Sequence, residues 1–102
     1  MLMKILTKPS LMQKVLGKEG IGSIEFIIDG VDNSTVRTLE LLAPKAKGDL
    51  TEFNPFNGSL HFTARANKRM YNFLGEVEKY VPEDELPENY HQVLGYLTGK
   101  YN

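Results

Sequence analysis

The chain has 102 residues, of which 41% are hydrophobic and 25% charged, and this composition fits a single compact domain spanning residues 1–102. It contains no cysteine, which excludes disulfides, thiolate nucleophiles and cysteine-based zinc or iron–sulfur sites. Twelve basic and thirteen acidic side chains give a net charge of −1, so no global field attracts the protein to nucleic acid or to an anionic membrane.

The first residues do not resemble a targeting segment. Lys4 and Lys8 interrupt the apolar N-terminus, so we expect no secretory signal. No stretch of about 20 apolar residues predicts a membrane span. We therefore expect a cytoplasmic protein without a membrane partner.

Charge is distributed unevenly along the chain. Residues 1–69 carry ten basic and seven acidic side chains, whereas residues 70–102 carry two basic and six acidic ones. The two segments therefore have net charges of +3 and −4. This polarity favours a contact that is oriented by electrostatics.

The first forty residues alternate apolar segments with turn signals. Residues 3–7 predict a strand, and Ser10 is a suitable N-cap for a short helix over residues 11–16. Residues 23–28 alternate with period two and predict a second strand. The turn signal at 29–34, followed by the β-branched run 35–42, predicts that 23–28 and 35–42 form a hairpin.

The middle of the chain predicts a loop and a second hairpin. Residues 43–48 include a proline and a glycine and predict an exposed basic loop. Residues 50–53 and 59–63 predict paired strands, joined by a turn at 54–58 that ends in Asn-Gly.

The last forty residues have helical periodicity. Apolar residues between 64 and 81 fall on one stripe, as do those between 86 and 101, and Pro82 separates the two segments. The stripes consist of Ala66, Met70, Phe73, Leu74, Val77 and Val81, and of Leu86, Tyr90, Val93, Leu94, Leu97 and Tyr101. We predict an α+β fold in which a small antiparallel sheet built from hairpins carries these two C-terminal amphipathic helices on one face.

The sequence contains no recognisable catalytic or metal motif. His61 and His91 have no acidic or histidine partner at a ligand spacing, and we interpret both as surface side chains. The segment 29–34 lacks the spacing of a calcium loop, and 17–22 does not lead from a strand into a helix as a phosphate-binding loop does. No nucleophile elbow is present. We expect no metal, no cofactor and no enzymatic activity, unless His61 converges with distant carboxylates as a hydrolase would require.

A cluster of cations near residue 65 contradicts a local rule of helix design. The predicted helix after Thr63 begins with Arg65, Lys68 and Arg69 and ends with glutamates, which reverses the preference of the helix dipole. At 100° per residue these three cations and Asn72 share the side opposite the apolar stripe. Two readings remain open: a solvated face neutralised within the fold, or an anion or partner site that Lys45 and Lys47 extend.

Two tyrosines lie away from the apolar stripes. Tyr71 and Tyr96 are expected to be exposed in a monomer, where they can anchor an interface. Phe56, His61 and Tyr71 also offer faces on which unpaired bases can stack.

These observations lead to two functional hypotheses. The first is a non-enzymatic protein-binding module or inhibitor that uses an exposed helix or sheet edge, with self-association into a homo-oligomer as one form of that contact. Accessory proteins of phages and mobile elements are commonly of this build. The alternative is a nucleic-acid or nucleotide-binding domain centred on Arg65, Lys68 and Arg69.

Overall fold

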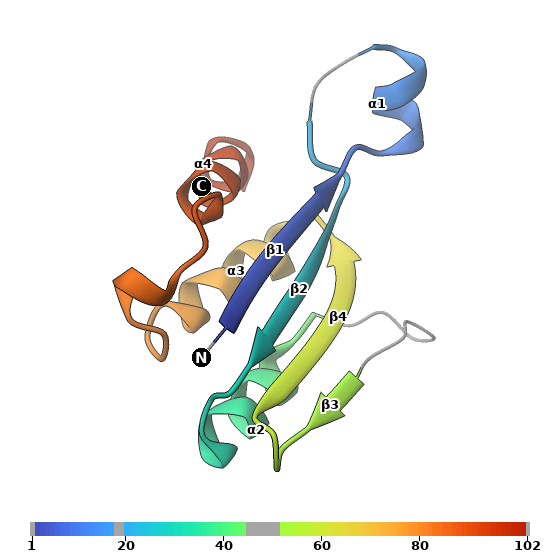
Figure 1. Cartoon of the computed structure of the whole chain (residues 1–102). Helices are drawn as coiled ribbons and strands as arrows, with labels where there is room; N and C mark the ends of the chain where they lie inside the picture. The colour runs from blue at the N-terminus through green and yellow to red at the C-terminus, as the bar shows by residue number, and fades with distance from the viewer. Residues whose placement is uncertain (1, 18–19, 45–51, 102) are drawn as a thin grey trace.

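The computed structural model describes residues 2–17, 20–44 and 52–101. In this part of the chain, one antiparallel sheet has the strand order β1-β2-β4-β3 (Figure 1). Its strands are β1 (Leu2–Lys8), β2 (Ser23–Asp29), β3 (Glu52–Asn54) and β4 (Ser59–Arg65). The helices are α1 (Leu11–Val15), α2 (Asn33–Leu42), α3 (Lys68–Val77) and α4 (Tyr90–Tyr101), with a 3₁₀ turn η1 at Glu83–Glu85. The predicted α+β class is confirmed.

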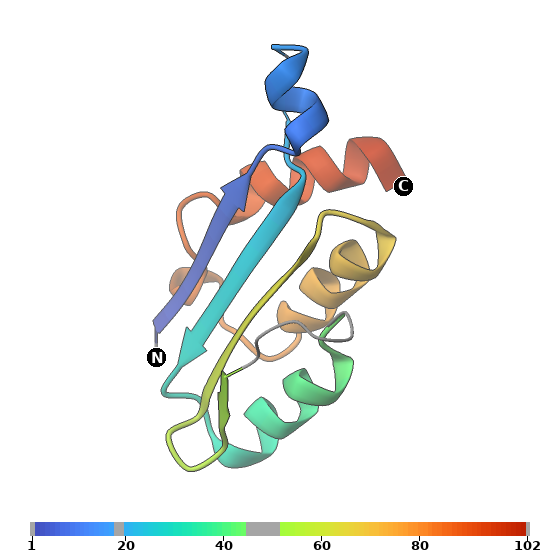
Figure 2. The same ribbon diagram turned by 90° about the vertical axis from the view of Figure 1, so that its right-hand side faces the viewer.

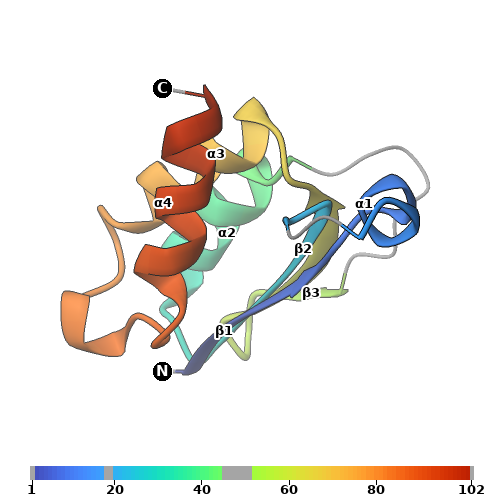
Figure 3. The same ribbon diagram turned by 90° about the horizontal axis from the view of Figure 1, so that it is seen from above.

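One face of the sheet forms the core. Side chains alternate between the two faces of a strand, and Ile24, Phe26 and Ile28 of β2 are buried on one of them. Figures 2 and 3 show α2, α3 and α4 against this face. The rings of Phe26 and Phe62 lie 5.0 and 5.3 Å from the ring of Phe73 on α3, in edge-to-face contacts that attach the helix layer to the two central strands.

The two predicted C-terminal helices are confirmed, and they contact each other. All six stripe residues of the first segment are buried, as are Tyr90, Val93 and Leu97 of the second. The hydroxyl of Tyr90 donates to the carbonyl oxygen of Leu74 at 3.1 Å and so connects α4 to α3. Burial raises the pKa of Tyr90 above its ordinary value, so the phenol remains a neutral donor.

The predicted hairpin between 23–28 and 35–42 is wrong. Strand β2 pairs with β1 and β4, and residues 33–42 form α2 instead of a strand. The Asp32 carboxylate caps this helix by accepting the backbone N–H of Thr35, and Val36 and Leu39 lie buried at a helical spacing of three. Capping and burial therefore outweigh the strand preference of the β-branched residues in this segment.

The second predicted hairpin is confirmed for its described residues. Strands β3 and β4 are antiparallel neighbours, with Phe53 opposite Leu60, while residues 50 and 51 lie outside the described ranges. Gly58 closes the turn with φ at +64°, a conformation that favours glycine. The first part of the chain also follows expectation, because Ser10 caps α1 and Gly17 ends it with φ at +65°.

Both C-terminal helices are shorter than the sequence predicts. Strand β4 continues to Arg65, which lies opposite Ser23, and α3 begins at Lys68 because the side chain of Asn67 caps it. Helix α4 begins at Tyr90 instead of residue 86. Within the described ranges, no helix has the length and apolarity needed to cross a membrane.

The cap of α2 generates a pH-dependent prediction. The Ser34 hydroxyl, followed by the hydroxyl and N–H of Thr35, donates to Asp32 and lowers its pKa from 3.8 to about 2. Because the folded-state pKa is the lower one, the contribution of Asp32 is present above the unfolded value and is lost as pH falls toward 2. In thermal melts followed by circular dichroism, the Tm of Asp32→Asn should therefore fall less between about pH 4 and pH 2 than the Tm of the wild type does. Equal losses in both proteins would contradict the assignment.

Candidate functional site

The structure separates the predicted cation cluster onto two faces. Arg65 ends β4 and, from its place in the strand, projects from the sheet face opposite the helices. Lys68 and Arg69 occupy the first turn of α3, in the helix layer. The prediction that Arg65 begins the same helix is therefore wrong, and the reversed charge pattern at the start of α3 rests on Lys68 and Arg69 alone.

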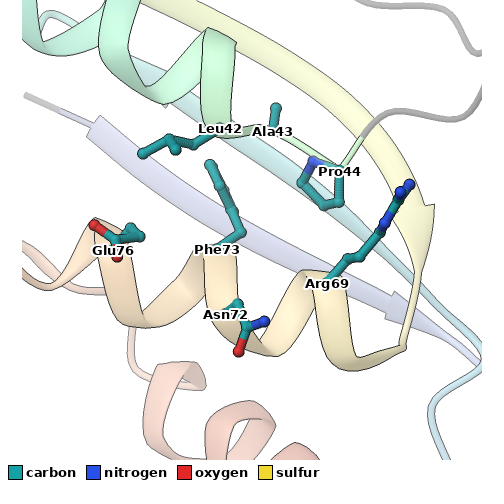
Figure 4. A pocket seen from close by; sticks show the side chains of 7 residues that line it. All are labelled: Leu42, Ala43, Pro44, Arg69, Asn72, Phe73 and Glu76. Atoms are coloured by element: carbon teal, nitrogen blue, oxygen red, sulfur yellow. The ribbon is translucent and has the colours of Figure 1, made fainter.

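Arg69 and Asn72 line the same groove. It lies between the end of α2 and α3, has a volume of about 460 Å³ and is also lined by Leu42, Ala43, Pro44, Phe73 and Glu76 (Figure 4). Phe73 is a buried part of its floor, whereas Arg69 is exposed. Within the described ranges the Arg69 guanidinium makes no hydrogen bond or ion pair, and Glu76 pairs with Lys79 at 3.0 Å.

Lys68 lies away from that groove lining. Its ammonium is 5.2 Å from the centre of the Tyr71 ring, a cation–π distance. The predicted extension by Lys45 and Lys47 falls outside the described residues. Of the six residues proposed for the site, the structure thus brings together only Arg69 and Asn72.

Tyr71 and Tyr96 are less exposed than the sequence predicts. Both are half-buried and pack against the hydrophobic core. The Tyr96 hydroxyl accepts a hydrogen bond from the side-chain amide of Gln13 at 3.4 Å, so this tyrosine connects α4 to the region of α1. The expectation of two freely exposed tyrosine anchors is wrong, because each ring covers part of its own fold.

His61 has carboxylate partners that sequence spacing does not reveal. Its Nε2 lies 3.2 Å from Glu25 on β2, and its Nδ1 lies 3.8 Å from Glu52 on β3. These contacts run between strands, so they depend on sheet register. His61 is therefore the one described histidine that lies within 4 Å of two carboxylates. Among the described residues no cluster of three or more histidine, aspartate or glutamate side chains is suited to a metal ion.

The most unusual surface is α1. Figures 1 and 2 show this helix projecting beyond the end of β1 and β2. It has five residues and buries none of them. Leu11, Met12, Val15 and Leu16 expose between 57% and 78% of their surface. Exposed apolar side chains gathered on one short element are typical of a contact surface.

The projecting helix is held in a defined position. We call residues 10–17 the arm. A reciprocal capping box joins Ser10 and Gln13, whose hydrogen bonds measure 2.7 and 3.1 Å. At its base, the N–H of Gly22 donates to the carbonyl of Lys8 at 2.7 Å, and a side chain at Gly22 would overlap the backbone of Ser10. Caps and close packing thus fix an element that contributes nothing to the core.

Next to the arm lies the second uncovered surface, which we call the open face. It is the side of the sheet opposite α2, α3 and α4 (Figure 3). Its side chains are Leu2, Lys4, Leu6 and Lys8 of β1, Ser23, Glu25, Ile27 and Asp29 of β2, Ser59, His61, Thr63 and Arg65 of β4, and Glu52 and Asn54 of β3. Leu2 and Leu6 are each 51% exposed, so the open face mixes apolar and charged groups.

Sequence reasoning identified the arm as a helix but not as a surface. The apolar residues 11, 12, 15 and 16 have the spacing of a core-facing stripe, and an amphipathic pattern does not show whether a partner covers it. The available signal was the length of the segment, since one or two turns between Pro9 and Gly17 are too short to span a core.

Comparisons with known proteins give no relative. Neither protein-family models nor curated proteins nor solved structures match this chain.

The free guanidinium of Arg69 predicts a contrast between neighbouring residues. Because Arg69 makes no described polar contact, Arg69→Ala should change the free energy of unfolding by less than about 0.5 kcal/mol. Asn67 accepts the N–H of Met70 at 3.1 Å as the N-cap of α3, so Asn67→Ala should cost about 1 kcal/mol. Urea denaturation measures both values. A loss at Arg69 equal to that at Asn67 would show that Arg69 is structural.

Proposed function

We propose that this protein is a non-enzymatic protein-binding module, with inhibition of its partner as one form of that activity, and that the arm is its docking element. The observation that carries the proposal is the exposure of Leu11, Met12, Val15 and Leu16 on a helix that is capped and fixed at its base. A partner that fully buries one of these large side chains gains roughly 1.5–3 kcal/mol of binding free energy from it.

The rigidity of the arm supports a role in binding. A segment that is already ordered loses less conformational entropy when it binds than a flexible one does. The capping box and the contact of Gly22 with Ser10 order the arm before any partner arrives. Short helices that present apolar side chains are a common means of docking into grooves of other proteins.

The charge of the N-terminal segment supports a polar rim around this contact. Residues 1–17 contain Lys4, Lys8 and Lys14 and no acidic residue. Lys14 lies on the arm and Lys8 at its base, so cations stand beside the apolar side chains, as in an interface with a polar rim. We therefore propose a partner surface that is apolar at its centre and acidic at its edge.

A second candidate function is the binding of nucleic acid or nucleotides at the groove. It is favoured by Arg69, whose guanidinium has no described partner and lies beside Asn72 at the positive end of α3. The dispersal of Arg65 onto the other face reduces the cationic surface available to one ligand. We therefore rank this function below protein binding.

The arm proposal predicts a selective loss of partner capture. In affinity capture from lysate of the source cell, Leu11→Ser/Val15→Ser should retain at least tenfold less partner than the wild type, because two anchors are lost. The matched control is Leu41→Ser, which replaces an equally exposed leucine on α2. Both variants should keep the wild-type free energy of unfolding within about 0.5 kcal/mol, since these side chains are exposed in the folded state. Equal capture by both variants would contradict the proposal.

The nucleic-acid alternative has its own signature. If protein binding is the function, labelled single strands and nucleotides should show no saturable binding in fluorescence anisotropy at low salt. Saturable binding that weakens steeply with salt, with a smaller slope for Arg69→Ala, would establish the alternative instead.

A further inference from the structure

The charges of the open face are ordered along the strands. At the end near the arm, Lys8, Ser23 and Arg65 form one cross-strand row that carries two cations and no acid. At the opposite end, Asp29 lies between Leu2 and Ser59, whose hydroxyl donates to the Asp29 carboxylate at 2.6 Å. The sheet therefore presents a basic end and an acidic end on the same surface.

Apolar groups are also divided between the two ends. The arm lies beyond the basic end, and the β3–β4 turn lies beyond the acidic end (Figure 1). That turn contains Phe56, which is 89% exposed and is the most exposed large hydrophobic residue in the described ranges. Leu2 lies at the same end and is 51% exposed.

We propose that the arm and the open face bind a second copy of this chain in a twofold dimer. The two open faces lie against each other, with the symmetry axis in the plane of the sheet and perpendicular to its strands. This inference rests on the proposed function, because the arm is the docking element in both, and it adds the identity of one partner.

This axis makes the charges complementary. Rotation about it reverses the strand direction and keeps each strand over its own counterpart, so the row of Lys8 and Arg65 lies over the row of Asp29 in the second copy. The carboxylate of Asp29 is then flanked by two cations. Glu25 faces the row that contains Lys4, His61 and Glu52, in which Lys4 is the cation without an acidic neighbour on the same row's adjacent strand. A twofold axis parallel to the strands would instead place the row of Lys8 and Arg65 over the same row of the second copy. Cations would then face cations, which repel each other.

The same axis also brings the apolar groups together. The arm of each copy extends past the basic end of its own sheet and thus reaches the acidic end of the other sheet, where Phe56 and Leu2 are exposed. Because the interface is isologous, both arms are buried in this way.

Surface area explains why both elements are needed. The three longer strands have seven residues each, so at the usual rise per residue and spacing between strands their face measures roughly 23 by 14 Å. That footprint is well below the roughly 800 Å² per partner of a stable interface. The four apolar side chains of the arm are also too few to form one by themselves. Together, the face and two arms approach the required size.

Sedimentation analysis of charge-reversal variants tests the dimer. The wild type should shift with concentration from the 11.5 kDa monomer to twice that mass. Arg65→Glu and Asp29→Arg should each weaken dimerisation at least tenfold, because each places like charges together twice. An equimolar mixture of the two variants should restore dimers, since each chain then supplies the charge that the other needs. Arg37→Glu, on the exposed side of α2, is the matched control and should dimerise as the wild type does.

The outcomes separate this inference from the proposed function. A monomer at all concentrations up to about 0.5 mM, a dimer unaffected by either reversal, or no recovery in the mixture would overturn the inference. If the chain stays monomeric while Leu11→Ser/Val15→Ser loses a captured partner, protein binding stands and the dimer is wrong. If Asp29→Arg does not give a wild-type circular dichroism spectrum, Asp29→Lys replaces it in the mixture. Lys8→Glu is a further charge reversal, and it should weaken dimerisation to the same extent as Arg65→Glu.

Discussion

The contact of Phe26 and Phe62 with Phe73 decides which side of this sheet is covered. These rings lie 5.0 to 5.5 Å apart and join the two central strands to α3. Edge-to-face packing of this kind adds roughly 0.5–1.5 kcal/mol for each pair to the gain from burial. Removal of one such ring from a core generally costs about 3–5 kcal/mol, a large part of the stability of a small domain. The helix layer therefore covers one face of the sheet, and the described helices leave the open face uncovered.

This commitment gives the molecule two regions with different physical roles. The helix layer and the inner sides of the strands contain the buried hydrophobic residues, and no polar or charged residue of the described chain is buried. The open face and the arm contribute little to that core, yet hydrogen bonds and close packing hold them in place. The open face therefore consists of the solvent-facing sides of the strands, and the arm is an exposed element that is ordered by its own cap and by packing at its base.

The sequence predicts those parts of the fold that depend on local periodicity. The stripes of α3 and α4, the alternation in β2 and the Asn-Gly turn at Gly58 all identify their elements correctly. The segment 33–42 fails because its β-branched residues favour a strand, whereas the cap at Asp32 and the burial of Val36 and Leu39 favour a helix. The cap is a local signal, whereas the burial of Val36 and Leu39 depends on the position of the segment over the sheet, which is tertiary information.

The candidate site was harder to predict, for a related reason. The cations 65, 68 and 69 are close in sequence, but the change from strand to helix at Asn67 turns Arg65 to the other face. Conversely, His61 meets Glu25 and Glu52 only through the register of three strands. The exposure of the arm depends on the absence of a core beside it, for which the only sequence signal is the short length of the segment between Pro9 and Gly17.

Paramagnetic relaxation enhancement between two copies tests the central claim most directly. The chain has no cysteine, so Lys14→Cys carries a single nitroxide on the arm and leaves its four apolar side chains intact. When this labelled chain is mixed with ¹⁵N-labelled wild-type chain, only intermolecular effects are observed. The account predicts broadening of the amides in the β3–β4 turn around Phe56 and near Asp29. Broadening confined to the arm itself, or none at concentrations up to about 0.5 mM, would contradict it.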